Sequence, residues 1–97
     1  MVLIRRSACL VTSGSGFAYS VSKLGVLHLV AMAAEEVSGT GITVNCVVPS
    51  IIDTPANRSA IPGADYASWP KIPDIAQAYL FLAAPGAHLV SGAAIPV

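Results

Sequence analysis

One segment of the chain is apolar at almost every position and rich in β-branched residues. It reads Ile42-Thr-Val-Asn-Cys-Val-Val48, and Pro49 ends it. A strand with one face in water alternates apolar and polar residues, whereas a nearly continuous apolar run is typical of a strand buried on both faces. This strand therefore requires a layer of structure on each side, which makes it the strongest constraint on the fold.

Two helices are expected around this strand. Residues 18–37 contain no proline, and apolar residues recur there at helical spacing until a pair of glycines follows. The apolar stripe is broad, so we expect this helix to pack on two sides. Pro73 and Asp74 are typical of a first helical turn and predict a second helix that reaches about Ala84.

Short apolar runs at residues 1–4 and 93–97 complete an alternation of strand, helix, strand, helix and strand. This order implies right-handed crossovers and a parallel sheet, which is the α/β class. Residues 50–71 are expected to form a long loop, and loops of this length are usually functional. Three parallel strands leave two edges unpaired, so we expect the 97 residues to be part of a larger fold.

Composition excludes two classes of function. Hydrophobic residues make up 55% of the chain and charged residues 10%, and five basic residues balance five acidic ones. A disordered tail needs low hydrophobicity and high charge, and an electrostatic nucleic-acid binder needs an excess of basic residues. No membrane span is expected, because the most apolar window, Leu24 to Ala34, is shorter than a bilayer requires.

No metal site is expected either. Cys9 and Cys46 form no CxxC motif, and His28 and His88 have no partner at metal-ligand spacing. The cysteines are expected to be small buried residues, which fits a reduced cytoplasmic setting. The arginines near the start are not followed by a continuous apolar region, so no targeting signal is expected.

Tyr19 and Lys23 are the residues with the clearest chemical meaning. Four positions apart on a helix, a phenol and an ammonium project from the same face. An ordinary tyrosine has a pKa of about 10 and is a poor base at neutral pH, but a fixed cation nearby favours the phenolate. Such a pair suits general acid/base chemistry on a carbonyl or alcohol oxygen.

Three segments then occur in a recognisable order: Tyr19-Ser-Val-Ser-Lys23, Gly41-Ile-Thr-Val-Asn45 and Pro49-Ser-Ile-Ile-Asp-Thr54. They resemble the Tyr-x-x-x-Lys, Val-Asn and Pro-Gly-x-Ile-x-Thr elements in the C-terminal half of short-chain dehydrogenases/reductases. The resemblance covers nearly the whole chain. It implies the C-terminal part of a Rossmann-like, doubly wound parallel sheet with three strands and two main helices, so residues 1–97 would be one partial NAD(P)-binding domain. Within the family, residues 53–69 look closest to dihydropteridine reductase and its bacterial relatives.

The resemblance implies a role for each matching residue. Tyr19 would be the proton donor to a carbonyl, and Lys23 would hold the nicotinamide ribose hydroxyls and favour the phenolate. Pro49, the backbone at Ile52 and the hydroxyl of Thr54 would lie against the nicotinamide carboxamide. The cofactor would be NAD or NADP, which supplies the hydride, and the substrate a small molecule with a carbonyl or alcohol group.

The long loop carries Tyr66 and Trp69, for which two roles are open. By resemblance the loop would close over a substrate, and the two aromatic rings would offer it a flat apolar surface. Alternatively, the rings only anchor the loop to the body of the domain.

Three departures from the family pattern stand out. The catalytic serine normally precedes the tyrosine by thirteen residues, and Arg6 occupies that position, with Ser7 one place away. Ser7 is the candidate replacement, although dihydropteridine reductase-like members lack this serine. Ser50 stands where glycine usually follows the proline. The sequence Ser13-Gly-Ser-Gly16 does not have the spacing of the glycine-rich turn that binds pyrophosphate.

Two functions from different classes follow. In the first, the chain is a fragment of an NAD(P)-dependent oxidoreductase, inactive by itself because the adenosine-binding half is missing. In the second, it is a non-catalytic interaction piece. The helix over residues 18–37 looks like the family's dimerisation helix, so a homo-oligomer is expected in the complete protein.

Overall fold

The computed structural model describes residues 2–3 and 16–97, and its order of elements confirms the expected alternation. The two main helices lie within one residue of the predicted bounds. The elements are β1 (Val2–Leu3), α2 (Phe17–Glu36), β2 (Cys46–Val48), α3 (Pro55–Ala60), α4 (Ile72–Ala83) and β3 (Ala94–Pro96), with 3₁₀ turns at Tyr66–Ser68 and Pro85–Ala87.

The three strands form one parallel sheet in the order β1-β2-β3, as expected for an α/β fold. Cys46 lies opposite Val2 on one side and Ala94 on the other, so the predicted buried strand is the central one. Cys46 and Val47 are fully buried and Val48 is 2% exposed. A parallel strand buried on both faces has this pattern.

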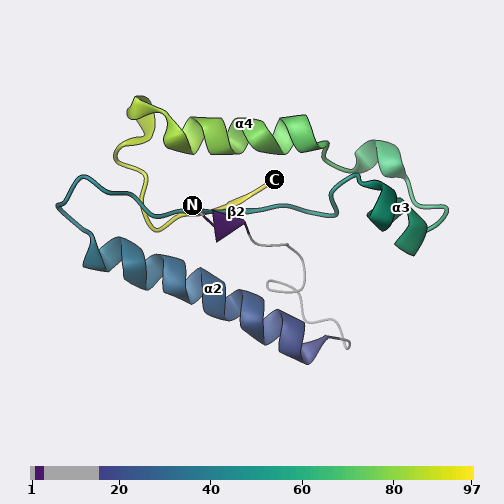
Figure 1. The fold of residues 1–97 in the computed structure, drawn as a ribbon, viewed down its shortest axis with the longest axis horizontal. Coiled ribbons are helices and arrows are strands. Elements are labelled where there is room, and N and C mark those ends of the chain that lie inside the picture. The colour runs from purple at the N-terminus through teal and green to yellow at the C-terminus, as the bar shows by residue number, and fades with distance from the viewer. Residues whose placement is uncertain (1, 4–15) are drawn as a thin grey trace.

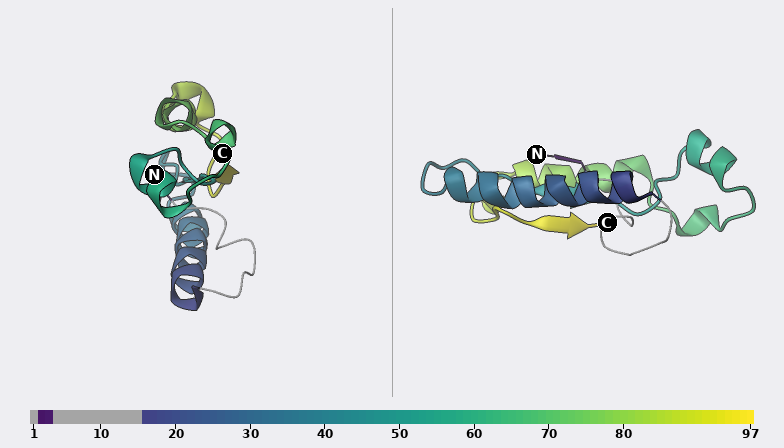
Figure 2. Two further views of the ribbon diagram at one scale, coloured as in Figure 1. Left: turned by 90° about the vertical axis from the view of Figure 1, so that its right-hand side faces the viewer. Right: turned by 90° about the horizontal axis from the view of Figure 1, so that it is seen from below.

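The two helices cover opposite faces of the sheet, so that β2 lies between α2 and α4 (Figure 1). Figure 2 shows the same layers from two further sides. Cys46 and Val48 pack with Val30 of α2, whereas Val47 packs with residues of α4. Successive side chains of a strand point to opposite faces, so three consecutive residues supply both halves of the core. The α4 residues are Ile75 and Leu82.

The central strand is shorter than predicted: the residues before it are held to the turn at residues 90–93 by side chains and by one backbone bond, from Gly92 N to Val44 O at 2.7 Å. Val44 donates its amide to Ser91 Oγ at 3.2 Å. Asn45 is 4% exposed, and its side-chain amide donates to Val90 O at 2.8 Å and accepts from Ala93 N at 3.1 Å. Asn45 therefore ties the start of β2 to the turn that leads into β3.

The predicted loop over residues 50–71 contains a helix and a 3₁₀ turn. Thr54 caps α3 by accepting a hydrogen bond from Asn57 N at 3.2 Å, and Pro55 occupies the first turn. Asp65 caps the 3₁₀ turn through Ala67 N at 3.2 Å. Neither of these two elements has a buried residue, so side-chain caps, not burial, hold them.

Helix α2 is apolar on the side that faces away from the sheet. By length and composition it could cross a membrane, which differs from the expectation based on the shorter Leu24 to Ala34 window; only 6% of its most apolar stretch is buried. A core helix of a soluble domain passes the same test, and α2 already packs on β2 through Val30. The outward residues include Val21, Leu29 and Met32, which are 57–68% exposed.

Candidate active site

The residues of the predicted site come from the start of α2 and from the segment that follows β2. Figure 1 shows these two places on the same side of the molecule. In a parallel sheet, that side is the one where the strands have their carboxyl ends, and ligands of α/β folds bind there. The topology therefore brings Tyr19 and Lys23 to the same end of the sheet as residues 49–54.

Tyr19 and Lys23 project from the same face of α2, as their spacing predicts. Lys23 Nζ lies 5.5 Å from the centroid of the Tyr19 ring, inside the roughly 6 Å range of a cation–π contact. Tyr19 is 41% exposed, so its ring is open to a ligand from solvent. The local geometry required for a phenol next to a cation is therefore present.

The predicted carboxamide contacts lie directly after β2. Pro49 is fully buried, and Ser50 donates its amide to Val97 O at 2.7 Å, which fixes the chain beside the end of β3. Asn57 holds the two other predicted contact residues: its side-chain amide donates to Ile52 O at 2.7 Å, and its backbone N–H donates to Thr54 Oγ1. The hydroxyl proton of a threonine that accepts one bond can still be donated, and a carbonyl oxygen has a second lone pair.

A mostly apolar pocket of about 310 Å³ opens between these residues and α4. It contacts Ile52 and Thr54 on one side and the first turns of α4 on the other. Tyr79 also lines it, and the Tyr79 hydroxyl is buried with no hydrogen-bond partner among the described residues. Burial raises the pKa of the Tyr79 phenol above its ordinary value. The α4 residues in the lining are Ile72, Ile75, Ala76 and Tyr79.

Asp53, between the two predicted contact residues, has both carboxylate oxygens in ion pairs. Arg58 Nε lies 2.6 Å from Oδ1, and Lys71 Nζ lies 2.5 Å from Oδ2. Hydrogen bonds from Arg58 and then Lys71 hold the pKa of the Asp53 carboxyl well below its usual range. Neither this cluster nor the role of Asn57 follows from a pattern in the sequence. The only signal for it was the occurrence of Asp53 and Arg58 in the same loop.

Tyr66 and Trp69 contact each other and their own segment. Their ring centroids are 5.0 Å apart in an edge-to-face arrangement. The Tyr66 hydroxyl donates to Ile61 O and accepts from Gly63 N, both at 3.1 Å. These contacts favour the anchoring role for Tyr66, because its polar atom is already engaged inside the loop.

The remaining predictions concern Ser7, the cysteines and a metal site. Ser7, Arg6 and Cys9 lie outside the described residues. Cys46 is fully buried, as predicted for a small apolar residue. Within residues 2–3 and 16–97, no three His, Cys, Asp or Glu side chains gather as a metal-binding group.

Comparison with known proteins supports the resemblance over nearly the whole chain. The family model described as Enoyl-(Acyl carrier protein) reductase matches residues 2–97. Galactitol 2-dehydrogenase of Rhizobium johnstonii is 40% identical in an alignment of 90 positions that covers 82% of this chain and 35% of that protein. The mitochondrial borneol dehydrogenase of Lavandula x intermedia is 36% identical in an alignment of 95 positions that covers 89% of this chain and 35% of that protein. The chain thus spans about a third of the length of these relatives.

Solved structures with the same arrangement include several short-chain dehydrogenases/reductases. A 7α-hydroxysteroid dehydrogenase, in complex with NADH and 7-oxo glycochenodeoxycholic acid, matches with a TM-score of 0.86 and 31% identity, over 98% of this chain and 41% of that one. The enzyme from Serratia marcescens matches with a TM-score of 0.84 and 28% identity, over 98% of this chain and 42% of that one. The closer likeness to dihydropteridine reductase stays a prediction. This chain belongs to the short-chain dehydrogenase/reductase family, as an α/β fragment of its Rossmann-like fold.

Proposed function

We propose that this chain carries the nicotinamide-facing part of an NAD(P)-dependent oxidoreductase. The reaction is hydride transfer between the cofactor and a carbonyl or alcohol carbon of a small molecule, with Tyr19 as the acid/base. The observation that carries the proposal is the position of Lys23 Nζ, 5.5 Å from the Tyr19 ring centroid on the same helix face. This arrangement lies at the end of the sheet where ligands of α/β folds bind.

The chain's own residues have separate tasks in this reaction. Tyr19 gives its hydroxyl proton to the substrate oxygen during reduction and takes it back during oxidation. Lys23 stabilises the phenolate that forms and binds the ribose hydroxyls as a donor. When bound, NADH or NADPH supplies the hydride, so the protein supplies orientation and the proton.

The residues after β2 fit the nicotinamide end of such a cofactor. Thr54 has a hydroxyl proton left to donate, and Ile52 O has a lone pair left to accept, which match the two polar groups of a carboxamide. Pro49 is buried and is the first of these residues; we call residues 49–54 the cofactor edge. The described residues contain no glycine-rich phosphate turn, so the fit extends to the nicotinamide end alone.

The named relatives support the substrate class but not an individual substrate. The names galactitol 2-dehydrogenase and borneol dehydrogenase describe oxidation of alcohols, and one structural neighbour holds NADH with a 7-oxo compound. We therefore propose a carbonyl/alcohol pair as the reacting group here, with NAD or NADP as the cofactor.

The test is turnover in a chimera that joins the preceding part of galactitol 2-dehydrogenase to this chain. Replacing Tyr19 by Phe removes the proton donor, so turnover with galactitol should be lost while NAD affinity stays nearly the same. Gln77→Ala is the control, because Gln77 lies on the exposed surface of α4 outside the pocket lining and should be dispensable. Full turnover in the Tyr19→Phe chimera would remove Tyr19 from its role.

A second candidate function is a non-catalytic piece that associates through α2, and the same face would build a homo-oligomer in the complete protein. The supporting observation is a groove of about 600 Å³ on the exposed face of α2, lined by Val21, Leu24, Gly25, Leu27 and His28. Phe17, at the start of this helix, is 80% exposed. Burying apolar area of this kind against a second copy is favourable.

Sedimentation of the 97-residue chain tests this association. Leu24→Glu should shift the chain towards the monomer, whereas Leu80→Glu should not, although Leu80 is a comparably exposed leucine on α4. An unchanged association state in Leu24→Glu would exclude this face. Association without any cofactor affinity would favour the non-catalytic function.

A further inference from the structure

The Asp53 carboxylate binds two basic residues of the segment over residues 54–71, Arg58 and Lys71. Arg58 of α3 makes two bonds to it, Nε to Oδ1 at 2.6 Å and Nη2 to Oδ2 at 2.9 Å. Lys71, at the start of α4, makes a third bond at 2.5 Å from Nζ to Oδ2. The Asp53 side chain is 10% exposed, whereas those of its two partners are 44–49% exposed. One carboxylate therefore joins α3 and α4.

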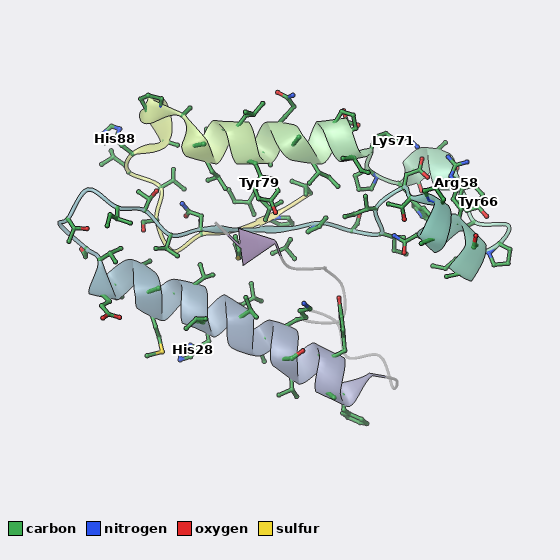
Figure 3. The ribbon with its side chains drawn as sticks, viewed as in Figure 1. His28, Arg58, Tyr66, Lys71, Tyr79 and His88 are labelled. Carbon is green, nitrogen blue, oxygen red and sulfur yellow. The ribbon has the colours of Figure 1, made fainter. Side chains whose placement is uncertain are left out.

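The backbone closes the same segment at the same place. The Asp53 amide donates to Pro70 O at 3.0 Å, and Lys71 Nζ also donates to Tyr66 O at 3.0 Å. Figure 3 shows Arg58, Tyr66 and Lys71 together at one end of the molecule. Residues 54–70 therefore form a loop whose two ends lie side by side, and Asp53 directly precedes its start and bonds to its end.

Arg58, which pairs with Asp53, also contacts the aromatic pair of Tyr66 and Trp69. The guanidinium carbon of Arg58 lies 4.7 Å from the Tyr66 ring centroid, and Trp69 packs edge-on against the same ring. A guanidinium over a ring face is a favourable contact, and it holds both groups in place. Trp69 is the single tryptophan of the chain, so its fluorescence reports on this arrangement alone.

The ion pairs are connected to the predicted nicotinamide contacts through α3. Asn57 precedes Arg58 on α3, and it holds Ile52 O at 2.7 Å while its backbone N–H donates to Thr54 Oγ1. A movement of α3 would therefore move the atoms on both sides of Asp53. The bidentate pairing of Arg58 with Asp53 fixes the orientation of α3 more closely than a single contact could.

We propose that Asp53 is a positioning residue: by holding Arg58 and Lys71 together, it fixes residues 54–71 and keeps Ile52 and Thr54 in place for a nicotinamide. The part that concerns the cofactor rests on the proposed function. The part that concerns the segment does not.

Trp69 fluorescence in the 97-residue chain tests the position of the segment without a cofactor. Asp53→Asn keeps the shape of the side chain and removes its charge. We expect a red-shifted Trp69 emission and acrylamide quenching increased by about twofold or more, because Tyr66 and Trp69 lose their fixed arrangement. Asp65→Asn is the matched control, because Asp65 caps a turn in the same segment, and asparagine preserves that acceptor.

A second pair of variants keeps the test decisive if Asp53→Asn unfolds the chain. Lys71→Met breaks one ion pair and leaves Arg58 on Asp53, so it should give a smaller emission shift, and Lys71→Arg should restore the wild-type emission. Far-UV circular dichroism reports the helices in each variant. Wild-type emission and quenching in both Asp53→Asn and Lys71→Met would overturn the proposal.

NADH titration of the galactitol 2-dehydrogenase chimera then tests the link to the predicted nicotinamide contacts. We expect Asp53→Asn to weaken NADH binding about tenfold and Asp65→Asn to leave it unchanged. Equal NADH affinity in wild type and Asp53→Asn would overturn the link. A wild-type chimera with no affinity for NADH would contradict the proposed function, and the Trp69 comparison would still decide whether Asp53 positions the segment.

Discussion

The two parts of the proposed site are built differently. Tyr19 and Lys23 stand on a regular helix whose remaining outward face is apolar and exposed. Residues 53–71 have little regular structure, yet ion pairs, caps and an aromatic pair fix them from within. The difference teaches that helix periodicity alone places the proposed catalytic pair, whereas the proposed nicotinamide contacts depend on side-chain contacts that the segment makes with itself.

The largest expected effect comes from the helix. In the galactitol 2-dehydrogenase chimera, Lys23→Met should lower turnover by roughly 100-fold to 1,000-fold, because phenolate stabilisation and the ribose contact are lost together. NAD affinity, measured by titration, should fall as well. Gln77→Met, on the exposed surface of α4, is the control and should leave the turnover unchanged. An unchanged NAD affinity in Lys23→Met would contradict the ribose contact.

The next effect concerns the sheet that supports both parts. Asn45→Ala leaves Val90 O and Ala93 N without their partner, and should lower the free energy of unfolding by roughly 2 kcal/mol. Urea denaturation followed by circular dichroism measures it. Gln77→Ala, on the exposed surface of α4, is the control and should change stability by less than about 0.5 kcal/mol. Equal stabilities of the two variants would remove Asn45 from its tying role.

A smaller effect is expected within the segment. Thr54→Ala removes the N-cap of α3 and should cost about 1 kcal/mol, whereas Thr54→Ser should restore most of it. Faster hydrogen exchange at Asn57 N, the amide that Thr54 accepts from, is the specific readout. If exchange at this amide is the same in wild type and Thr54→Ala, the cap does not hold α3.

The smallest effect is the response of the segment to mild acid. The pKa of Asp53 is lower in the folded chain than in the unfolded one, so its contribution to stability is present above the ordinary carboxyl value and is lost as the pH falls through the folded value. The charged groups that face it are Arg58 and Lys71. Trp69 emission should therefore stay constant between about pH 8 and pH 5 and change only in stronger acid. A transition in Trp69 emission near neutral pH would contradict this assignment.

The sequence was sufficient for features that depend on local periodicity. The apolar run around Cys46 predicted the central strand, and the spacing of Tyr19 and Lys23 predicted a shared helix face. The contact between Asp53 and Lys71 could not be predicted, because the two residues are 18 positions apart and no periodic pattern relates them. The same holds for Asn57, whose role depends on how α3 folds back on Ile52.

The shortened strand has a similar explanation. Residues 42–45 carry the strand pattern, but whether they pair depends on a neighbouring strand and not on their own propensity. In the structure, the side chains of Ser91 and Asn45 and a backbone bond from Gly92 N to Val44 O hold them instead. Likewise, the broad apolar stripe of α2 indicated packing on two sides, and the structure supplies one of them, through Val30.

The central claim is that α2 and the segment after β2 face the same nicotinamide. The most direct measurement is a titration of the isotope-labelled 97-residue chain with reduced nicotinamide mononucleotide, followed by NMR. The claim requires saturable shifts at Tyr19, Lys23, Ile52 and Thr54, with none at His88, which lies at the far end of α4 (Figure 3). Shifts confined to one of the two parts, or absent from all four residues at millimolar ligand, would contradict it.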